Sequence, residues 1–153
     1  MKSALLAVPA LGAMLLFSGC ATTGSLSDKD RLAVYRSHAG QPVSKFRYNG
    51  SFMGWTDLGD DALALQTRPN ESWLLEFSSA CPGLSSAMGI ALTSTMNQVY
   101  TRFDKVLVRG GIPGGCPISS IRPLDTQALK AEMKALRQVE AAERAAVKDS
   151  PAA

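Results

Sequence analysis

The stretch Ala62-Leu-Ala-Leu-Gln-Thr-Arg-Pro-Asn-Glu-Ser-Trp-Leu-Leu-Glu-Phe77 decides the fold. Large apolar side chains occupy alternate positions in both of its halves: Leu63, Leu65, Trp73, Leu75 and Phe77. A period of two is that of a β-strand with one face turned toward a core. Between the halves, Pro69 presets its φ angle and Asn70 tolerates left-handed geometry, as a tight turn requires. The stretch therefore predicts two antiparallel strands joined by a turn at 68–71.

The same period continues upstream. Phe46 and Tyr48 alternate with charged residues, and further alternation follows around Trp55. The segment 58–61, Leu-Gly-Asp-Asp, has the composition of a turn. From Pro42 onward we therefore expect a meander of antiparallel strands joined by short turns.

Downstream the pattern is interrupted and then resumes. Cys81-Pro-Gly-Leu84 breaks the alternation and predicts a turn over 82–87. Further strands are expected over 88–93, 103–109 and 116–121. The Gly-rich segment 110–115 lacks the Gly-Lys-Ser/Thr of a phosphate-binding loop and precedes a strand-like segment, so we interpret it as a hairpin connection.

Helical signals stand at both ends of this region. Ser27 and Asp30 have capping-box spacing and Gly40 offers a stop, so a short helix is expected over 28–38 with Leu32 and Tyr35 facing the core. A longer helix is expected over 126–147, capped by Asp125 or Thr126 and docked through its first half. Its apolar side chains recur at helical spacing: Leu129, Met133, Leu136 and Val139. The predicted class is α+β, with a small antiparallel sheet or barrel-like meander of about six strands.

Length and composition limit the remaining possibilities. The 153 residues are enough for one domain, and 46% hydrophobic and 19% charged residues exclude wholesale disorder. The net charge of +3 comes from lysines and arginines spread along the chain without a basic block, so nucleic acid is not expected as a partner.

The first twenty residues have the organisation of an export signal. Lys2 is followed by an uncharged apolar stretch over 4–17, which is short for a transmembrane helix. Phe17-Ser18-Gly19-Cys20 then resembles the lipobox of bacterial lipoproteins, whose cysteine is acylated and becomes the new N-terminus. A plain secretory signal and an uncleaved anchor helix are the alternatives. Since two or more acyl chains anchor a protein stably, the resemblance implies attachment to a membrane through Cys20.

The expected organisation is a signal peptide over 1–19, a flexible tether over 20–27, a sheet-rich domain over 28–125 and a helix with a frayed tail over 126–153. Ala21, rather than Asp, follows Cys20. By resemblance to enterobacterial sorting, this favours the periplasmic face of the outer membrane.

Cys81 and Cys116 are the two cysteines that remain. In an oxidising compartment such a pair indicates a disulfide, and only one pairing is available. The Cys-x-x-Cys spacing of many redox-active pairs is absent, although free thiols are also compatible with the sequence.

No residue pattern specifies catalysis or metal binding. His38 is the one histidine, and a zinc site needs three or four ligands, so a surface or capping role is favoured. Asp57, Asp60 and Asp61 do not fit the calcium-binding pattern of an EF-hand and suit a turn. Aromatic side chains at alternating strand positions usually belong to a core, but they could line a small cavity if the sheet curls. Those considered are Phe46, Phe52, Trp55, Trp73 and Phe77.

Taken together, several segments resemble a family of small proteobacterial exported lipoproteins that is catalogued only as a domain of unknown function. The resemblance covers about residues 30–128 and is carried by Tyr35, His38-Ala-Gly-Gln-Pro-Val43, Phe46, Gly54-Trp55, Leu58-Gly-Asp60, Thr67-Arg-Pro-Asn70, Trp73-Leu-Leu75, Cys81, Leu84, Phe103-Asp104, Cys116-Pro-Ile118 and Ile121-Arg-Pro-Leu-Asp125. It implies export and a compact sheet-rich domain in which paired cysteines are frequent, and it supplies no catalytic residues.

The sequence thus predicts a lipid-anchored envelope protein, not an enzyme, that acts as a binding or interaction module. Its expected partners are the membrane, through Cys20, and an envelope protein. No cofactor and no metal is expected. A small-ligand binder with a pocket inside the curved sheet is the alternative, followed by an envelope hydrolase.

Overall fold

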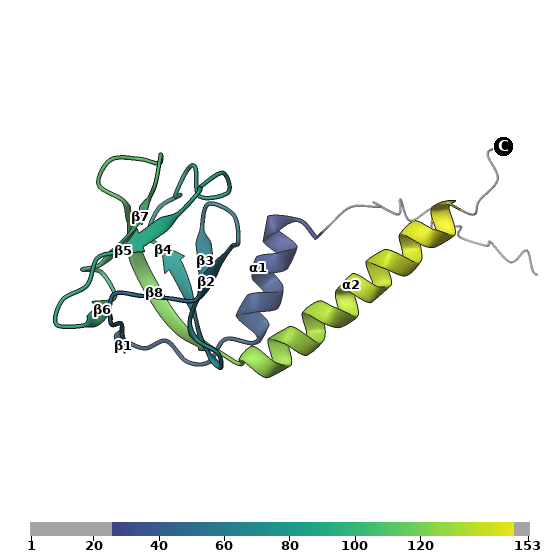
Figure 1. The fold of residues 1–153 in the computed structure, drawn as a ribbon, viewed down its shortest axis with the longest axis horizontal. Coiled ribbons are helices and arrows are strands. Elements are labelled where there is room, and N and C mark those ends of the chain that lie inside the picture. The colour runs from purple at the N-terminus through teal and green to yellow at the C-terminus, as the bar shows by residue number, and fades with distance from the viewer. Residues whose placement is uncertain (1–25, 149–153) are drawn as a thin grey trace, which may run out of the picture.

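The computed structural model describes residues 26–148, which form an α+β domain with one long helix projecting from it (Figure 1). The elements in chain order are α1 (Asp28–Ser37), β1 (Lys45–Arg47), β2 (Gly54–Asp57), β3 (Ala62–Arg68), β4 (Glu71–Phe77), β5 (Ile90–Leu92), β6 (Gln98–Tyr100), β7 (Lys105–Val108), β8 (Cys116–Leu124) and α2 (Thr126–Lys148). The α+β class, the short N-terminal helix and the longer C-terminal helix are confirmed. The predicted signal peptide, Cys20 and residues 149–153 lie outside the described residues.

Six antiparallel strands form a curled sheet, a half-barrel, in the order β2-β3-β4-β8-β7-β5. The predicted hairpin over 62–77 is confirmed, since Leu63 pairs with Leu75 and Arg68 pairs with Glu71 across the Pro69-Asn70 turn. β2 extends this hairpin by pairing with β3, with Trp55 opposite Leu65. The meander prediction therefore holds for β2, β3 and β4.

β1 does not belong to this meander, which corrects the expectation for the segment that starts at Pro42. It pairs with β6, a strand that the sequence analysis did not predict, and the two form a separate ribbon. Before β1, the chain follows β8 instead of β2: the Val43 amide donates to the Ile121 carbonyl at 2.8 Å. The alternation around Phe46 is equally compatible with either neighbour, because a strand's period does not identify its partner.

β8 is longer than predicted and ends at Leu124 instead of 121. Pro123 cannot donate to a neighbouring strand, but its carbonyl accepts the Gly40 amide at 2.8 Å. Gly40 therefore serves this close approach, since a Cβ there would lie 3.1 Å from the Pro123 ring. The expected helix stop is supplied by His38 at the C-cap of α1.

The central strands bury both of their faces. On β3, Leu63 and Leu65 point into the concave side of the sheet, where they pack with the aromatic side chains, while Ala62 and Ala64 point to the outer side. The small alanines admit α1, whose Leu32 and Tyr35 are buried against them as predicted. A hydrogen bond of 2.8 Å from Arg36 Nε to Glu76 on β4 also holds α1 to this face.

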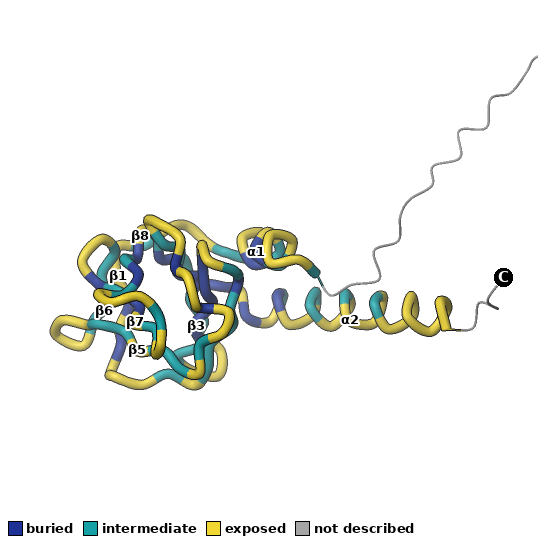
Figure 2. Tube along the Cα trace, turned by 90° about the horizontal axis from the view of Figure 1, so that it is seen from above, coloured by how far each residue is buried: buried dark blue, intermediate teal, exposed yellow. Residues whose placement is uncertain are grey.

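α2 begins as expected, with the Asp125 carboxylate accepting the Gln127 and Ala128 amides. Leu129 is buried and Met133 packs against the outer-face cluster, so the first turns dock. Val139 lies beyond this docked half, and 56% of it is exposed, because the helix has by then left the domain. Beyond Glu140 the helix is exposed throughout, as Figure 2 shows.

The Gly-rich segment joins β7 to β8, as predicted, in a hairpin that places Val106 opposite Cys116. Gly115 has a φ of +71°, and a Cβ there would lie 2.7 Å from the Val106 carbonyl oxygen. A glycine is therefore required at this position by both conformation and space.

Among residues 26–148, no helix combines the length and the hydrophobicity that crossing a bilayer demands.

Replacing Ala62 with Leu should force α1 off the outer face, because this alanine is fully buried there. We expect a loss of about 1–3 kcal/mol in the free energy of unfolding, the usual cost of overpacking. Urea unfolding followed by tryptophan fluorescence measures it. Ala91→Leu on the exposed side of β5 is the matched control and should stay within about 0.5 kcal/mol of the wild type. Equal losses in both variants would contradict the two-sided burial.

Candidate functional site

Of the predicted site residues, Cys81 and Cys116 are brought together. They form a disulfide with a Cα–Cα distance of 5.5 Å, and both are buried in the core on the concave side. The bond ties the segment after β4 to the start of β8. Its position inside the packed core gives it a structural role, and neither sulfur is accessible to a substrate. Cys20 lies outside the described residues.

His38, at the end of α1, contacts α2. Its Nε2 atom pairs with the Glu132 carboxylate, which links the two helices. The neighbouring Ser37 hydroxyl donates to the Val34 carbonyl instead of the His38 ring. A nucleophile–base pair needs a hydroxyl within hydrogen-bond reach of the imidazole. The hydrogen bonds at this histidine are therefore those of a helix-to-helix contact.

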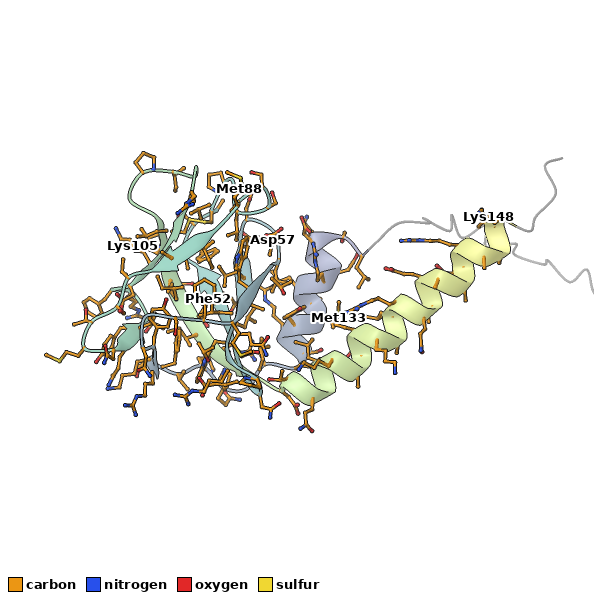
Figure 3. The ribbon with its side chains drawn as sticks, in the orientation of Figure 1. Phe52, Asp57, Met88, Lys105, Met133 and Lys148 are labelled. Carbon is orange, nitrogen blue, oxygen red and sulfur yellow. A yellow bond between two sulfur atoms is a disulfide. The ribbon has the colours of Figure 1, made fainter. Side chains whose placement is uncertain are left out.

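The aspartates near residue 60 form a turn against the N-terminus of α1. Asp57 accepts the Gly59 amide at 3.0 Å, and Asp28 of α1 lies against Gly59 (Figure 3 labels Asp57). Burial raises the pKa of Asp57, and the charges of Asp28 and Asp60 raise it further, whereas the Gly59 amide and Arg31 lower it. Within the part of the chain that the structure describes, no group of three or more metal-ligating side chains occurs.

The concave side of the sheet is filled by side chains. Phe46 stacks on Trp73 with ring centroids 4.9 Å apart, and Tyr48 meets Phe46 edge to face at 6.4 Å. Phe52, Trp55 and Phe77 pack against the same cluster. These aromatic residues therefore pack in or against the core, which is the more common of the two roles considered, and they do not enclose a cavity within the curled sheet.

A groove of about 300 Å³ lies instead on the outer side, between the sheet and α2. Its lining is mixed: Gly54, Thr56 and Ser72 are small or polar, whereas Trp55, Leu65, Leu124, Leu129 and Met133 are apolar. Lys130 and Arg137 of α2 line its wall, and none of the lining residues is acidic. The groove thus has the polarity of a site for a small anion.

A second surface with exposed cations lies on the β1–β6 ribbon, on the other side of the sheet from α2 (Figure 1). We define the β1–β6 face as the outward side chains of this ribbon and the tip of its loop: Lys45, Arg47, Met96, Gln98 and Tyr100. Lys45 Nζ lies 5.3 Å from the centre of the Tyr100 ring, and 89% of Met96 is exposed. A shallow hollow of about 330 Å³ lies between the two cations and Met96.

No exposed acid lies near this face in the sequence. Residues 31–56 contain no Asp or Glu, and residues 78–124 contain only Asp104. Asp104 is buried, where it accepts the Thr93 hydroxyl and the Tyr100 amide, each at 2.7 Å. Four exposed acids lie beside α1, Asp28, Asp30, Asp60 and Asp61, but exposed cations accompany them there and on α2, among them Lys29, Lys134 and Arg144. The β1–β6 face is therefore set apart by cations that have no exposed acid near them in the sequence.

The backbone at and near the β1–β6 face includes three residues other than glycine that have positive φ angles. Met96 and Asn97 both have positive φ, 51° and 58°, in a two-residue turn closed by hydrogen bonds of 2.9 and 3.0 Å between Thr95 and Gln98. Such turns favour Asn or Gly, so Met96 is held exposed at an energetic cost. Arg102, with φ of 69°, precedes Phe103, which is 83% exposed. The sequence analysis did not identify Met96 and Phe103 as residues of a surface site. The lack of Asp and Glu in the surrounding sequence, apart from Asp104, could have indicated such a surface.

The fold and this geometry define a small disulfide-bonded α+β half-barrel with a helical extension. Residues 1–140 match a family of unknown function, DUF6491, and the chain belongs to that family. The match confirms the resemblance to a family of unknown function, and it covers the first 140 residues, reaching into α2. No curated protein and no solved structure shows significant similarity to the chain.

Removing the disulfide with Cys81→Ala and Cys116→Ala should destabilise the protein by about 4 kcal/mol, because the bond closes a long loop in the unfolded chain. Urea unfolding of the wild type and the double variant measures the difference. Dithiothreitol is the control, since it should destabilise the wild type and leave the variant unchanged. A stability unaffected by both treatments would contradict a structural role for the bond.

Asp57→Asn should stabilise the protein at pH 7, because the folded state holds the Asp57 carboxylate in surroundings that disfavour its charge. A raised folded pKa means that the group's stabilising contribution is complete below its unfolded pKa and is lost as the pH rises through the folded pKa. The advantage of the amide should therefore shrink as the pH falls and vanish near pH 3. Urea unfolding across this range tests it, with Asp61→Asn as the control. An advantage that grows toward low pH would refute it.

Proposed function

We propose that the protein is a lipid-anchored envelope protein that acts as a non-enzymatic interaction module and presents the β1–β6 face to a partner. One observation carries the proposal: the start of the described chain and the β1–β6 face lie on opposite sides of the sheet (Figure 1). Attachment on one side would leave the other side accessible.

The attachment end is defined by Leu26. Its amide donates to Glu140 of α2 at 3.2 Å, so the chain leaves the domain beside this helix. Five residues lie between Cys20 and Leu26, and an extended chain over these six Cα–Cα steps spans at most about 20 Å. An acylated Cys20 would therefore hold the α2 side close to the bilayer, with the β1–β6 face directed away from it.

The lipobox-like segment that ends at Cys20 supports the anchor, and Ala21 supports the outer membrane as its site. The exposed Met96 and Phe103, together with cations that no nearby exposed acid neutralises, support a protein partner in the envelope. Such surfaces steer oppositely charged partners during association.

A small-ligand binder is the second candidate function. The groove between the sheet and α2 supports it, because Lys130 and Arg137 could hold an anionic group there and none of the lining residues is acidic. This site lies outside the curved sheet, not within it.

The proposal is tested on the protein purified from the membrane fraction of a Gram-negative host. Intact mass should match a chain that starts at Cys20 and carries acyl groups. A photoreactive amino acid at position 96 should then form one discrete covalent adduct in living cells, because this position lies on the β1–β6 face.

Position 88 supplies the matched control, since Met88 is 91% exposed but lies away from the ribbon (Figure 3 labels Met88). The photoreactive residue should give no such adduct there. Cys20→Ser should abolish acylation and release the chain from the membrane. An unacylated wild-type chain would contradict the lipid anchor at Cys20. Identical adducts from positions 88 and 96 would contradict the assignment of the β1–β6 face as the partner-binding surface.

A further inference from the structure

We propose that the β1–β6 face binds an extended, acidic segment of a protein, which adds to the free edge of β1 as a third strand. This inference rests on the proposed function, because it names the chemistry of the partner of that face. It is carried by the register of the ribbon, the charge of its edge and the exposure of its tip.

The register shows which backbone groups of β1 are free. The Thr101 amide donates to the Ser44 carbonyl at 3.0 Å, and the Tyr48 amide donates to the Asn97 carbonyl at 2.8 Å. Hydrogen-bonded pairs alternate along an antiparallel ladder, so residues 44, 46 and 48 direct their backbone groups toward β6. Lys45 and Arg47 consequently direct their N–H and C=O groups away from β6.

These outward groups are available to a partner. Lys45 and Arg47 are both exposed, and the contact of this edge with β8 ends upstream of them, at the hydrogen bond from the Val43 amide to the Ile121 carbonyl. Neither residue's backbone makes a hydrogen bond to another described residue outside the ribbon. A strand edge of this kind is the template for β-strand addition, in which main-chain hydrogen bonds supply affinity.

The charge of the edge selects the strand that can be added. Lysine on an exposed edge discourages pairing between identical edges, which is a common protection against aggregation. Lys45 and Arg47 would repel a second copy of β1 in the same way. They would attract a strand that carries carboxylates at alternate positions, since opposite charges across paired strands stabilise them.

The exposed tip favours a polypeptide over other polyanions. Met96 lines the same hollow as Lys45 and Arg47, and it offers an apolar contact at the end of the ribbon. A polypeptide strand supplies carboxylates on one face, apolar side chains and a hydrogen-bonding backbone at once. A polysaccharide has carboxylates but lacks the backbone pattern that the free edge of β1 matches.

The test uses the full-length protein, purified in detergent micelles from its host membrane, and a short fluorescein-labelled peptide that alternates Glu and Val. Fluorescence anisotropy should show saturable binding of this peptide, and no binding of a twin that alternates Lys and Val. N-methylation of the Glu amides should weaken binding by about tenfold or more, because in an antiparallel addition the residues opposite Lys45 and Arg47 are the ones whose N–H groups pair with β1.

Two variants separate backbone pairing from charge. Arg47→Gln keeps the outward N–H and should weaken binding severalfold. Arg47→Pro removes the same charge and also the N–H, but it leaves the hydrogen bonds to β6 intact, so binding should be lost. Arg144→Gln, on the exposed half of α2, is the matched control and should bind like the wild type.

Three outcomes would overturn the inference. N-methylated and unmodified peptides could bind equally, which would show plain electrostatic attraction. Polygalacturonate could displace the peptide at equal carboxylate concentration, which would favour an acidic polysaccharide. A doubled mass by sedimentation equilibrium, with Lys45 protected from acetylation in the dimer, would assign the edge to a second copy of this chain. If Arg47→Pro fails to fold, the N-methylated peptide still decides the result.

Failure of the anchor and failure of this inference are distinguishable. Intact mass reports acylation at Cys20 whether or not a peptide binds. An unacylated chain that binds the acidic peptide would overturn the anchor alone, and an acylated chain that does not bind it would overturn the strand addition alone.

Discussion

Every other part of this structure depends on the burial of β3 and β4 on both faces. Leu63 and Leu65 fill the concave side, while Ala62 and Ala64 leave space on the outer side for α1. Without α1, the outer faces of these strands would be exposed apolar surface, and without the concave cluster the sheet would have no reason to curl. α1 in turn, through His38 and the outer-face cluster, provides the surface on which α2 docks. Both ends of the chain are thus positioned by one hairpin.

The sequence alone was sufficient for features that depend on neighbouring residues. The 62–77 hairpin followed from alternation and the Pro69-Asn70 turn, and both helices followed from their caps. The Cys81–Cys116 bond followed because no other pairing was available. Prediction failed where the outcome depends on distant segments. The period of β1 does not reveal its pairing with β6, a strand that the sequence analysis did not predict. The β1–β6 face combines residues about fifty positions apart, so local patterns could not locate it.

Both the charge and the backbone strain of the β1–β6 face depend on hydrogen bonds in the adjoining turns. Asp104 is the one acid in its neighbourhood, and it is used internally, where its carboxylate fixes the turn that follows β6. The positive φ angles of Met96, Asn97 and Arg102 cost free energy that the surrounding hydrogen bonds must offset. Cations and apolar side chains are consequently presented by a rigid scaffold. A loop that had to become ordered on binding would lose part of its affinity to conformational entropy.

The disulfide also determines how the protein responds to a cut chain. Residues 82–115 lie between its two cysteines and include the exposed loops that carry Met88, Phe103 and Ile112, which are the kind of segment that proteases attack first. Cleavage of any single peptide bond in this span leaves both fragments covalently joined through a buried bond. The strands on either side of the nick remain paired within one molecule. A protease could therefore open this half of the domain without releasing it from the rest of the chain.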